Sequence, residues 1–169
     1  MIEGLTTEAL NPGHDRTAFS CGVEALDRYL RERATQDVRR RVSNCFVAFS
    51  PAGGIVAYYT FAATGIPLTE LAPEVIRRLP RYPTIPAALI GRLAVDQQFH
   101  GQGLGAALII DAVARAVRAE AAIFALVVDA KDDTAVRFYQ HLGFRRFVSH
   151  PMRLYLPVAE AARHLADRT

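Results

Sequence analysis

The chain has 169 residues, of which 51% are hydrophobic and 22% charged, as expected of a globular protein with one core. Two cysteines, Cys21 and Cys45, make neither a disulfide framework nor a Cys/His metal site, and a net charge of +3 alone points to no class of partner. No apolar run reaches the roughly 20 residues that span a bilayer, and no secretory pattern opens the chain. We therefore expect one cytoplasmic domain over residues 1–169.

The first third of the chain predicts an edge strand, a helix and a hairpin. One short edge strand is expected before Thr17. Apolar residues then recur at three- and four-residue steps, which predicts a helix with one apolar face, at Val23, Leu26, Leu30 and Ala34. Ser20 is the predicted N-cap of this helix. Strands over residues 42–49 and 55–61 follow, joined by a turn at Pro51-Ala52-Gly53-Gly54.

The remainder predicts alternating strands and helices. A short helix with a loop over residues 68–80 precedes a strand over 87–95, whose near-continuous apolar character indicates that both faces are buried. A helix over 104–119, a strand over 123–128 and a helix over 134–142, ended by Gly143, come next. Strands over 144–148 and 152–156 and a final helix after Pro157 complete the order. This order indicates an α/β or α+β fold with a central mixed sheet.

A glycine-rich loop joins the strand over 87–95 to the long helix, with the sequence Gly101-Gln102-Gly103-Leu104-Gly105. Glycines let backbone N–H groups turn inward, and the helix start adds free N–H groups and the positive end of its dipole. Together these features can bind a pyrophosphate. A glycine-rich turn without a ligand is the alternative.

Two other phosphate motifs fit poorly. A Walker loop ends in Gly-Lys-Ser/Thr, whereas Gly105 is followed by two alanines. A dinucleotide fingerprint usually follows the first strand of a doubly wound sheet, whereas this loop comes after residue 99 and behind a hairpin.

Two segments resemble motifs of the GNAT acetyltransferases. Arg92-Leu93-Ala94-Val95 followed by Phe99-His100-Gly101-Gln102-Gly103-Leu104-Gly105 resembles their acetyl-CoA motif, and Phe138-Tyr139-Gln140-His141-Leu142-Gly143-Phe144 resembles a later element. His100 is a departure, because the family prefers Gln or Arg at that place. The resemblance implies the GNAT fold, a central mixed, mostly antiparallel sheet flanked by helices.

The resemblance also implies that acetyl-CoA is the cofactor. Leu93 and Val95 would offer backbone groups to the pantetheine arm, where a bulge splays the strand. The loop would hold the pyrophosphate. The implied cofactor-binding residues are Leu93, Ala94, Val95, His100, Gly101, Gln102, Gly103, Leu104, Gly105, Ala106, Asp132 and Phe138.

Acetyl transfer needs stabilisation of an oxyanion and a proton for the leaving thiolate. The Val95 N–H can polarise the acetyl carbonyl, and the Tyr139 hydroxyl can act as general acid. The alternative for Tyr139 is a packing tyrosine. No carboxylate is an evident general base, because Asp96, Asp129, Asp132 and Asp133 fit loop or N-cap positions. An α-amine, with a pKa of about 7.7–8.0, needs no dedicated base. No metal is implied.

The N-terminal third resembles the toxin branch of this family. The residues that carry the resemblance are Gly13-His14-Asp15-Arg16, Phe19-Ser20-Cys21-Gly22 and Leu26-Asp27-Arg28-Tyr29-Leu30. These toxins acetylate the α-amine of the amino acid on charged tRNA, which blocks translation. They are encoded beside ribbon-helix-helix antitoxins and are typically dimers, so both partners are implied here.

Arginines are grouped as a tRNA-binding protein would need them. Residues 28–41 contain six arginines and two acids, an excess of four positive charges. Guanidinium groups pair well with phosphates. The predicted tRNA-binding residues are Arg39, Arg40, Arg41, Arg77, Arg78, Arg92, Arg145 and Arg146. Solvated helix faces are the alternative for each of them.

Two further functions stay open at this point. The chain could acetylate a small-molecule amine or a protein N-terminus. It could also be a non-catalytic module that binds CoA for regulation, although Tyr139 counts against this.

Overall fold

The computed structural model describes residues 6–50 and 54–167. It divides into two compact units, residues 1–62 with 91–111 and residues 63–90 with 112–169. The prediction of one domain over 1–169 stays a prediction. Of the predicted turn at residues 51–54, only Gly54 lies within the described residues. None of the helices described is long and apolar enough to cross a membrane.

The strands form one mixed sheet, as predicted. Their bounds are β1 Thr6–Ala9, β2 Asn44–Phe49, β3 Ile55–Pro67, β4 Thr84–Ile90, β5 Leu93–Val95, β6 Ala125–Asp129, β7 Arg145–Arg146 and β8 Arg153–Pro157. The hydrogen-bonded order is β1-β2-β3-β4-β6-β8-β7, and β5 pairs with β3 off this path. β4 and β6 are parallel, whereas the β1–β2, β2–β3, β3–β5, β6–β8 and β7–β8 pairs are antiparallel. The predicted edge strand before Thr17 is β1.

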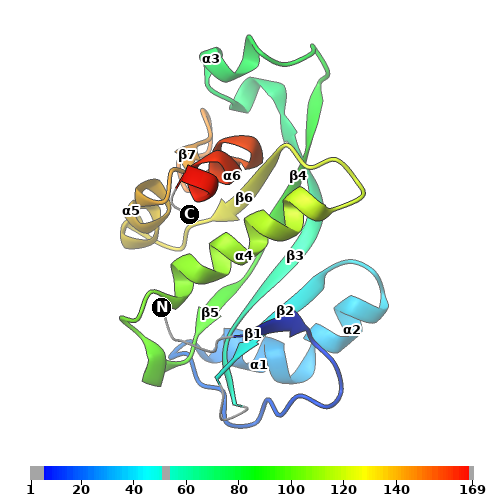
Figure 1. Ribbon diagram of the computed structural model, residues 1–169, viewed down its shortest axis with the longest axis vertical. Helices are drawn as coiled ribbons and strands as arrows, with labels where there is room; N and C mark the ends of the chain where they lie inside the picture. The colour runs from blue at the N-terminus through cyan, green and yellow to red at the C-terminus, as the bar shows by residue number, and fades with distance from the viewer. Residues whose placement is uncertain (1–5, 51–53, 168–169) are drawn as a thin grey trace. The chain divides into compact units, whose positions relative to one another are not determined.

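The first unit packs two short helices on its strands (Figure 1). These are α1 (Glu24–Glu32) and α2 (Ala34–Arg39). Leu30 and Ala34, from the predicted apolar stripe, are fully buried in a cluster with Val47 and Tyr58. The stripe was predicted as one helix, but the chain breaks at Arg33, whose φ/ψ of −121°/−30° leaves the helical region. Val23, 37% exposed, precedes the helix.

The predicted N-cap, Ser20, is wrong. Val23 occupies that position without a side-chain cap. Between them Gly22 turns the chain at φ +96°, which separates Ser20 from the first turn. The carboxylate that holds this turn belongs to Asp27, which accepts a hydrogen bond from the Cys21 N–H at 2.9 Å and is buried.

The predicted single strand over residues 87–95 is divided into β4 and β5. The break lies at Gly91-Arg92, where the Arg92 N–H donates to Thr60 Oγ1 at 2.9 Å. The chain therefore leaves β6, the parallel partner of β4, and continues as β5 against β3. The apolar run crosses this break unchanged, so the composition alone gives no sign of it.

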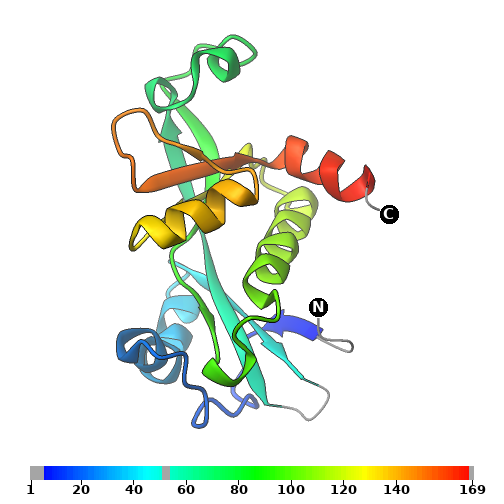
Figure 2. The same ribbon diagram turned by 90° about the vertical axis from the view of Figure 1, so that its left-hand side faces the viewer.

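The second unit contains most of the remaining helices. Their bounds are η1 Leu68–Glu70, α3 Pro73–Ile76, α5 Asp133–His141 and α6 Val158–Asp167, and α4 (Leu104–Arg118) begins in the first unit and ends in the second. The core contains Ile66, Leu71, Phe147 and Tyr155. α3 lies beyond the ends of the β3 and β4 ribbons (Figure 2).

The end of α5 confirms the predicted role of Gly143. Its φ is +102°, a left-handed conformation that favours glycine after a helix. Its N–H donates to the Gln140 carbonyl at 3.0 Å. A Cβ added here would lie 3.4 Å from Leu156 Cδ1.

We predict that Asp27→Ala destabilises the protein by about 1–3 kcal/mol, because it leaves the buried Cys21 N–H without its acceptor. Ser20→Ala is the matched control and should change the free energy of unfolding by less than about 0.5 kcal/mol, as is usual for an exposed side chain. Urea denaturation measures both. A larger loss from Ser20→Ala than from Asp27→Ala would contradict this assignment.

Candidate functional site

β5 presents backbone groups on the edge that faces away from β3. The Thr60 N–H donates to the Arg92 carbonyl at 3.0 Å, and the Asp96 N–H donates to a β3 carbonyl at 2.8 Å. Alternate residues of an antiparallel ladder turn both backbone groups to the same neighbour, so Leu93 and Val95 direct theirs away from β3. Such an edge can hydrogen-bond an extended amide chain. Leu93, Ala94 and Val95, three of the predicted acetyl-CoA-binding residues, make up β5, and the side chain of Ala94 is buried. We call β5 the donor strand, because acetyl-CoA is the acyl donor.

The side chain of His100 is held by this strand. Its Nε2 lies 2.7 Å from the Val95 carbonyl oxygen, so the Nε2–H tautomer donates to it. The Val95 N–H keeps its direction toward the open edge. A contact of the His100 ring with a phosphate, as the resemblance implies, therefore competes with an existing hydrogen bond.

The glycine loop has the backbone conformation that an anion cradle needs. Gly101 and Gly103 both have φ of +78°, which is strained for any other residue, and a Cβ at either would meet nothing within 4 Å. α4 begins at Leu104, and the Ala107 N–H donates to the Gly103 carbonyl at 3.1 Å. The N–H groups just before Ala107 have no intrahelical acceptor, and the helix dipole places its positive end there. They belong to Leu104, Gly105 and Ala106, next to the exposed Gln102.

Asp96 braces the approach to this loop. Its carboxylate accepts from the Gln98 N–H at 2.9 Å and from the Ser20 N–H at 3.0 Å. It is therefore the N-cap of η2 (Gln97–Phe99), which confirms the predicted N-cap position. The Gln97 N–H also donates to the Ser20 carbonyl at 2.8 Å. The segment Phe19–Gly22 is part of the resemblance to the toxin branch. It is thus hydrogen-bonded to the residues that lead into the glycine loop.

Tyr139 lies on α5 between two aromatic rings. Its ring centroid is 5.2 Å from that of Phe138 and 5.3 Å from that of Phe144. Burial, with a smaller contribution from the charge of Asp129, raises the pKa of Tyr139 to about 12. The hydroxyl is therefore protonated at physiological pH and has a proton to donate. It forms no hydrogen bond to any residue that the structure describes, and its oxygen is not buried, so it can meet a ligand.

Asp132 precedes α5 (Asp133–His141), and Phe138 lies in the second half of the same helix. Asp132 is the N-cap of α5 and accepts from the Ala135 N–H at 2.8 Å. This confirms the N-cap alternative and occupies one of its oxygens. Phe138 is 36% exposed, so one side of its ring is open to a ligand. Their contacts with a cofactor stay predictions.

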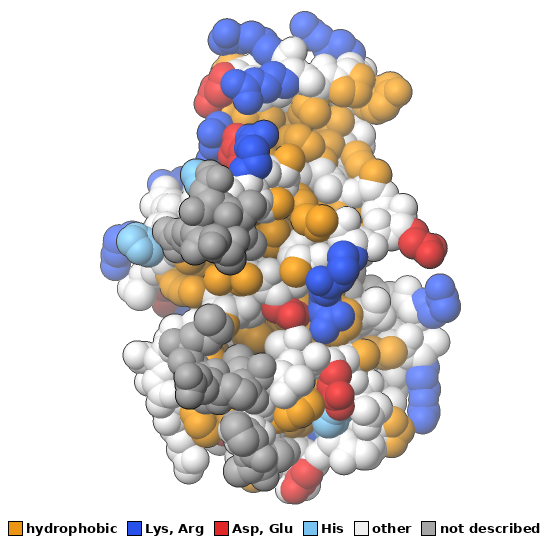
Figure 3. All heavy atoms as spheres, viewed as in Figure 1, with side chains coloured by type: hydrophobic (Ala, Val, Ile, Leu, Met, Phe, Trp, Pro, Cys, Tyr) orange, Lys and Arg blue, Asp and Glu red, His pale blue; other side chains and the backbone are white. Residues whose placement is uncertain are grey.

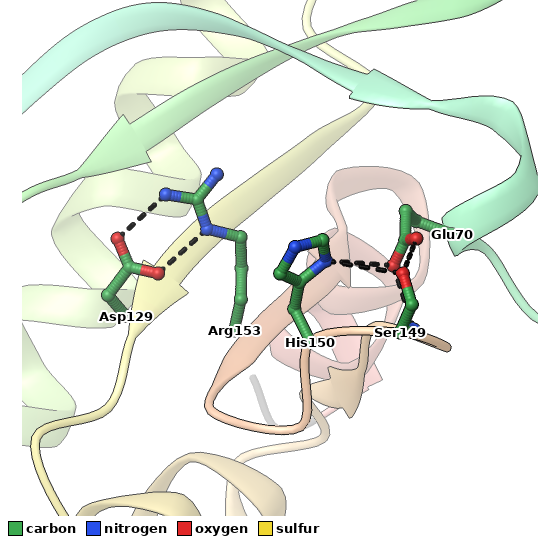
Figure 4. A network of polar contacts seen from close by, with 5 residues as sticks. All are labelled: Glu70, Asp129, Ser149, His150 and Arg153. Atoms are coloured by element: carbon green, nitrogen blue, oxygen red, sulfur yellow. Dashed lines mark hydrogen bonds and ion pairs between the residues drawn. The ribbon is translucent and has the colours of Figure 1, made fainter.

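Two groups of polar contacts lie in the second unit, one between β6 and β8 and one between η1 and the loop before β8 (Figure 4). Asp129 and Arg153, cross-strand partners, form a bidentate ion pair with distances of 2.7 and 3.0 Å. Glu70, buried at the end of η1, accepts hydrogen bonds from the Ser149 N–H at 3.0 Å and from the Ser149 hydroxyl. His150 Nδ1 lies 3.4 Å from the same carboxylate. Glu70 therefore fastens the loop between β7 and β8 to η1.

The predicted tRNA-binding arginines fall into two groups. Most are exposed, and their side chains form no ion pair or hydrogen bond within the described part of the chain: Arg39, Arg40, Arg41, Arg77, Arg78 and Arg146. Figure 3 shows basic side chains gathered at the end of the second unit that carries α3. Arg145 pairs with Glu74 at 3.1 Å and Glu160 at 3.9 Å. Arg92 is half-buried, and its guanidinium lies 3.5 Å from the ring centroid of Tyr29.

The thiols of Cys21 and Cys45 are both buried. Burial raises the pKa of Cys21 to about 11 and that of Cys45 to about 12, so neither is a thiolate at neutral pH. In the part of the chain that is described, no group of three or more His, Cys, Asp or Glu residues could hold a metal ion.

Sequence reasoning missed the carboxylates that brace loops from a distance. Asp27 and Glu70 each accept backbone N–H groups, over separations of six and 79 residues. An acid in the first turn of a helix was the available signal for Asp27. Glu70 gave none, because its partner Ser149 lies on a later strand connection.

Comparisons with known proteins find acetyltransferases and toxins similar to this chain. The acetyltransferase (GNAT) domain family matches residues 84–153. A tRNA-acetylating toxin of Mycobacterium tuberculosis (strain ATCC 25618 / H37Rv) is 34% identical over 160 residues, 94% of this chain and 95% of that protein. The structure of AtaT complexed with acetyl-methionyl-tRNAfMet has a TM-score of 0.86 and 28% identity, covering 95% of this chain and 99% of that one. A third similar structure is a tyrosine-to-phenylalanine mutant of the toxin AtaT, bound to the C-terminus of the antitoxin AtaR and acetyl-CoA. It has a TM-score of 0.76 and 25% identity, and the match covers 96% of this chain and 98% of that chain.

We predict a pH-dependent loss of stability in Glu70→Gln. The hydrogen bonds from Ser149 lower the pKa of Glu70 below its ordinary value of 4.5. The ionised carboxylate therefore stabilises the fold above that pH, and this stabilisation is lost as the pH falls through the folded-state pKa. The difference in unfolding free energy between wild type and variant should therefore be greatest above about pH 5 and should close in more acid solution. Urea denaturation from pH 7 to 3 measures it. Glu24→Gln, at an exposed ion pair, is the control and should show a small difference throughout; a Glu70 difference independent of pH would refute the assignment.

Proposed function

The chain belongs to the GNAT acetyltransferase family, and we propose that it transfers the acetyl group of acetyl-CoA to the α-amine of aminoacyl-tRNA and so blocks translation. The observation that carries the catalytic part is Tyr139, whose ring is buried while its protonated hydroxyl reaches the surface and has no partner among the described residues. The relatives named above, a tRNA-acetylating toxin and a toxin complexed with acetylated initiator tRNA, support the acceptor.

The acyl donor is held by main-chain groups in this proposal. The outward N–H and C=O groups of Leu93 pair with the pantetheine arm and the Val95 N–H faces its acetyl end, since the Val95 carbonyl already accepts from His100, while the glycine loop and the start of α4 surround the pyrophosphate. Positive φ at Gly101 and Gly103 turns loop N–H groups toward one anion, as in backbone nests. The donor strand and the loop lie in the same unit and are joined by the Asp96 cap.

The reaction needs few side chains. The neutral amine attacks the acetyl carbonyl carbon, the Val95 N–H stabilises the oxyanion, and the carbon–sulfur bond then breaks as the amine loses its proton to water. Tyr139 donates to the departing sulfur. A thiol, with a pKa of about 8.5, is a stronger acid than Tyr139, so the hydroxyl contributes most as a hydrogen-bond donor while negative charge develops on sulfur.

The proposed acceptor, aminoacyl-tRNA, is supported by the positive charge of the exposed arginines and by the pKa of an α-amine. An α-amino group with a pKa of about 7.7–8.0 is partly neutral at cytoplasmic pH, which suits a site whose carboxylates are occupied as caps and braces. The unpaired arginines supply phosphate contacts. We propose Arg39, Arg40, Arg41, Arg77, Arg78 and Arg146 for this role, and Arg145 as a further contact that must first leave Glu74 and Glu160.

The same relationship suggests how the activity is controlled. We expect the protein to work in the cytoplasm as a homodimer and to be neutralised by an antitoxin of the ribbon-helix-helix class. Co-purification with the product of a neighbouring gene tests this partner. A GNAT enzyme of a small amine or a protein N-terminus, and a non-catalytic CoA-binding module, are the alternatives.

Tyr139→Phe should reduce acetylation of charged tRNA by about 10²–10⁴-fold and abolish growth arrest on expression, while acetyl-CoA still binds. The assay is thiol release with charged tRNA, with polyamines and peptides as competing acceptors. Tyr82→Phe removes a hydroxyl from an exposed ring and is the matched control. If wild type modifies only the small amines, the tRNA proposal fails; if no acceptor releases thiol, the non-catalytic module is favoured.

The pH profile of kcat/KM follows from the same pKa. Because burial raises the pKa of Tyr139 to about 12, no descending limb from its deprotonation should appear up to about pH 10. The rate should instead rise with deprotonation of the acceptor amine. A descending limb near pH 8 or 9 that is absent in Tyr139→Phe would contradict this.

Arg41→Gly should weaken tRNA binding while it stabilises the fold. Arg41 has φ +61°, a left-handed conformation that costs a non-glycine residue roughly 1–2 kcal/mol. Glycine relieves this cost but removes one phosphate contact, which should lower the slope of log K against log salt by about 0.7–0.9. Thermal unfolding and tRNA binding at several salt concentrations measure the two effects. An unchanged salt slope would exclude Arg41 from the tRNA surface.

A further inference from the structure

We propose that Arg92 is a positioning residue for the acyl-donor strand rather than a phosphate ligand, acting through Tyr29 and Thr60. The inference rests on the proposed use of β5 by acetyl-CoA. It concerns the two residues that separate β4 from β5, and all of the contacts that carry it lie within the first unit.

The guanidinium of Arg92 is engaged inside the unit. It lies 3.5 Å from the ring centroid of Tyr29, a residue that is only 4% exposed. The Tyr29 hydroxyl donates to Asp37 at 2.7 Å, so the ring cannot slide away from the cation without breaking that bond. A desolvated cation–π contact is among the stronger forms of this interaction. One planar face of the guanidinium is therefore covered, unlike those of the exposed Arg39 and Arg40.

The backbone of Arg92 is fixed by one buried residue. Its N–H donates to Thr60 Oγ1 at 2.9 Å, and its carbonyl accepts from the Thr60 N–H at 3.0 Å. Thr60 is 1% exposed and lies opposite Cys45 in the β2–β3 pair. Arg92 is thus held through its main chain by the sheet and through its side chain by α1.

These two attachments of Arg92 fix the position and the register of the first residue of β5. Leu93 follows Arg92 directly, and the register Tyr59↔Leu93 depends on where the chain crosses Thr60. If Arg92 moved, the outward backbone groups of Leu93 and Val95 would move with it. Since these groups are the proposed hydrogen-bond partners of the pantetheine arm, the effect should appear in donor binding.

The test compares Arg92→Met, Arg92→Lys and Tyr29→Phe with Arg77→Ala, an exposed arginine in the other unit. Acetyl-CoA affinity is measured by calorimetry without acceptor, KM is measured for each substrate, and tRNA affinity is measured as a function of salt. We expect Arg92→Met to weaken acetyl-CoA binding about tenfold and raise its KM, with less loss in Arg92→Lys, which retains a cation. Tyr29→Phe keeps the ring but loses the bond to Asp37, so a smaller loss in the same direction is expected.

The salt dependence separates the two roles of Arg92. As a positioning residue it leaves the tRNA salt slope and the KM for tRNA unchanged, whereas Arg77→Ala should lower the slope by about 0.7–0.9 and leave acetyl-CoA affinity intact. A lowered slope with unchanged acetyl-CoA affinity in Arg92→Met would overturn the proposal. If Arg92→Met does not fold, Arg92→Lys and Tyr29→Phe decide, and normal acetyl-CoA affinity in both would overturn it as well. Failure of wild type to acetylate charged tRNA would refute the proposed function and leave the donor measurements to judge Arg92.

Discussion

The pair of hydrogen bonds between Thr60 and Arg92 determines what β5 can offer a ligand. At this point the chain leaves the parallel partner of β4 and continues along β3 through alternate residues. The carbonyl of Arg92 and the N–H of Asp96 face β3, so the groups of Leu93 and Val95 must face the open edge. A continuous strand over residues 87–95 would keep a neighbour on both sides and would have no free edge. The free edge that we propose for donor recognition therefore depends on a break that is maintained by one buried threonine.

The sequence predicts the fold well where periodicity and glycine positions carry it. The mixed sheet, the long α4, the ends of α5 and the glycine loop follow from apolar runs bounded by glycines, and Gly101, Gly103 and Gly143 all have positive φ. The sequence does not predict the local structure where that structure is determined by a side chain elsewhere in the chain. Ser20 has the composition of an N-cap, but Gly22 turns the chain and Asp27 takes the bond. The break at Arg92 depends on a partner 32 residues earlier, which no local pattern contains.

The same limit applies to the acids of the site. Asp96 and Asp132 are acids that the sequence places near predicted loops, where a general base could lie, and Glu70 is a third acid at a loop. In the structure all three accept backbone N–H groups, from Gln98 and Ser20, from Ala135 and from Ser149. A carboxylate in this role helps to hold a loop and has less capacity left to accept a proton. An acceptor that deprotonates unaided, such as an α-amine, is chemically consistent with this arrangement.

The arginines show why a count of charges is a poor guide to a nucleic-acid surface. An excess of four positive charges over residues 28–41 describes side chains with different surroundings. Arg31 lies 3.2 Å from Glu24 and Arg28 lies 3.7 Å from the same carboxylate, whereas Arg39, Arg40 and Arg41 have no such partner among the described residues. A phosphate must displace whatever a guanidinium already contacts, so unpaired and exposed groups gain most from binding it. By the same reasoning Arg92, whose guanidinium already lies over the buried ring of Tyr29, gains little from binding a phosphate. This agrees with the positioning role that we propose for it.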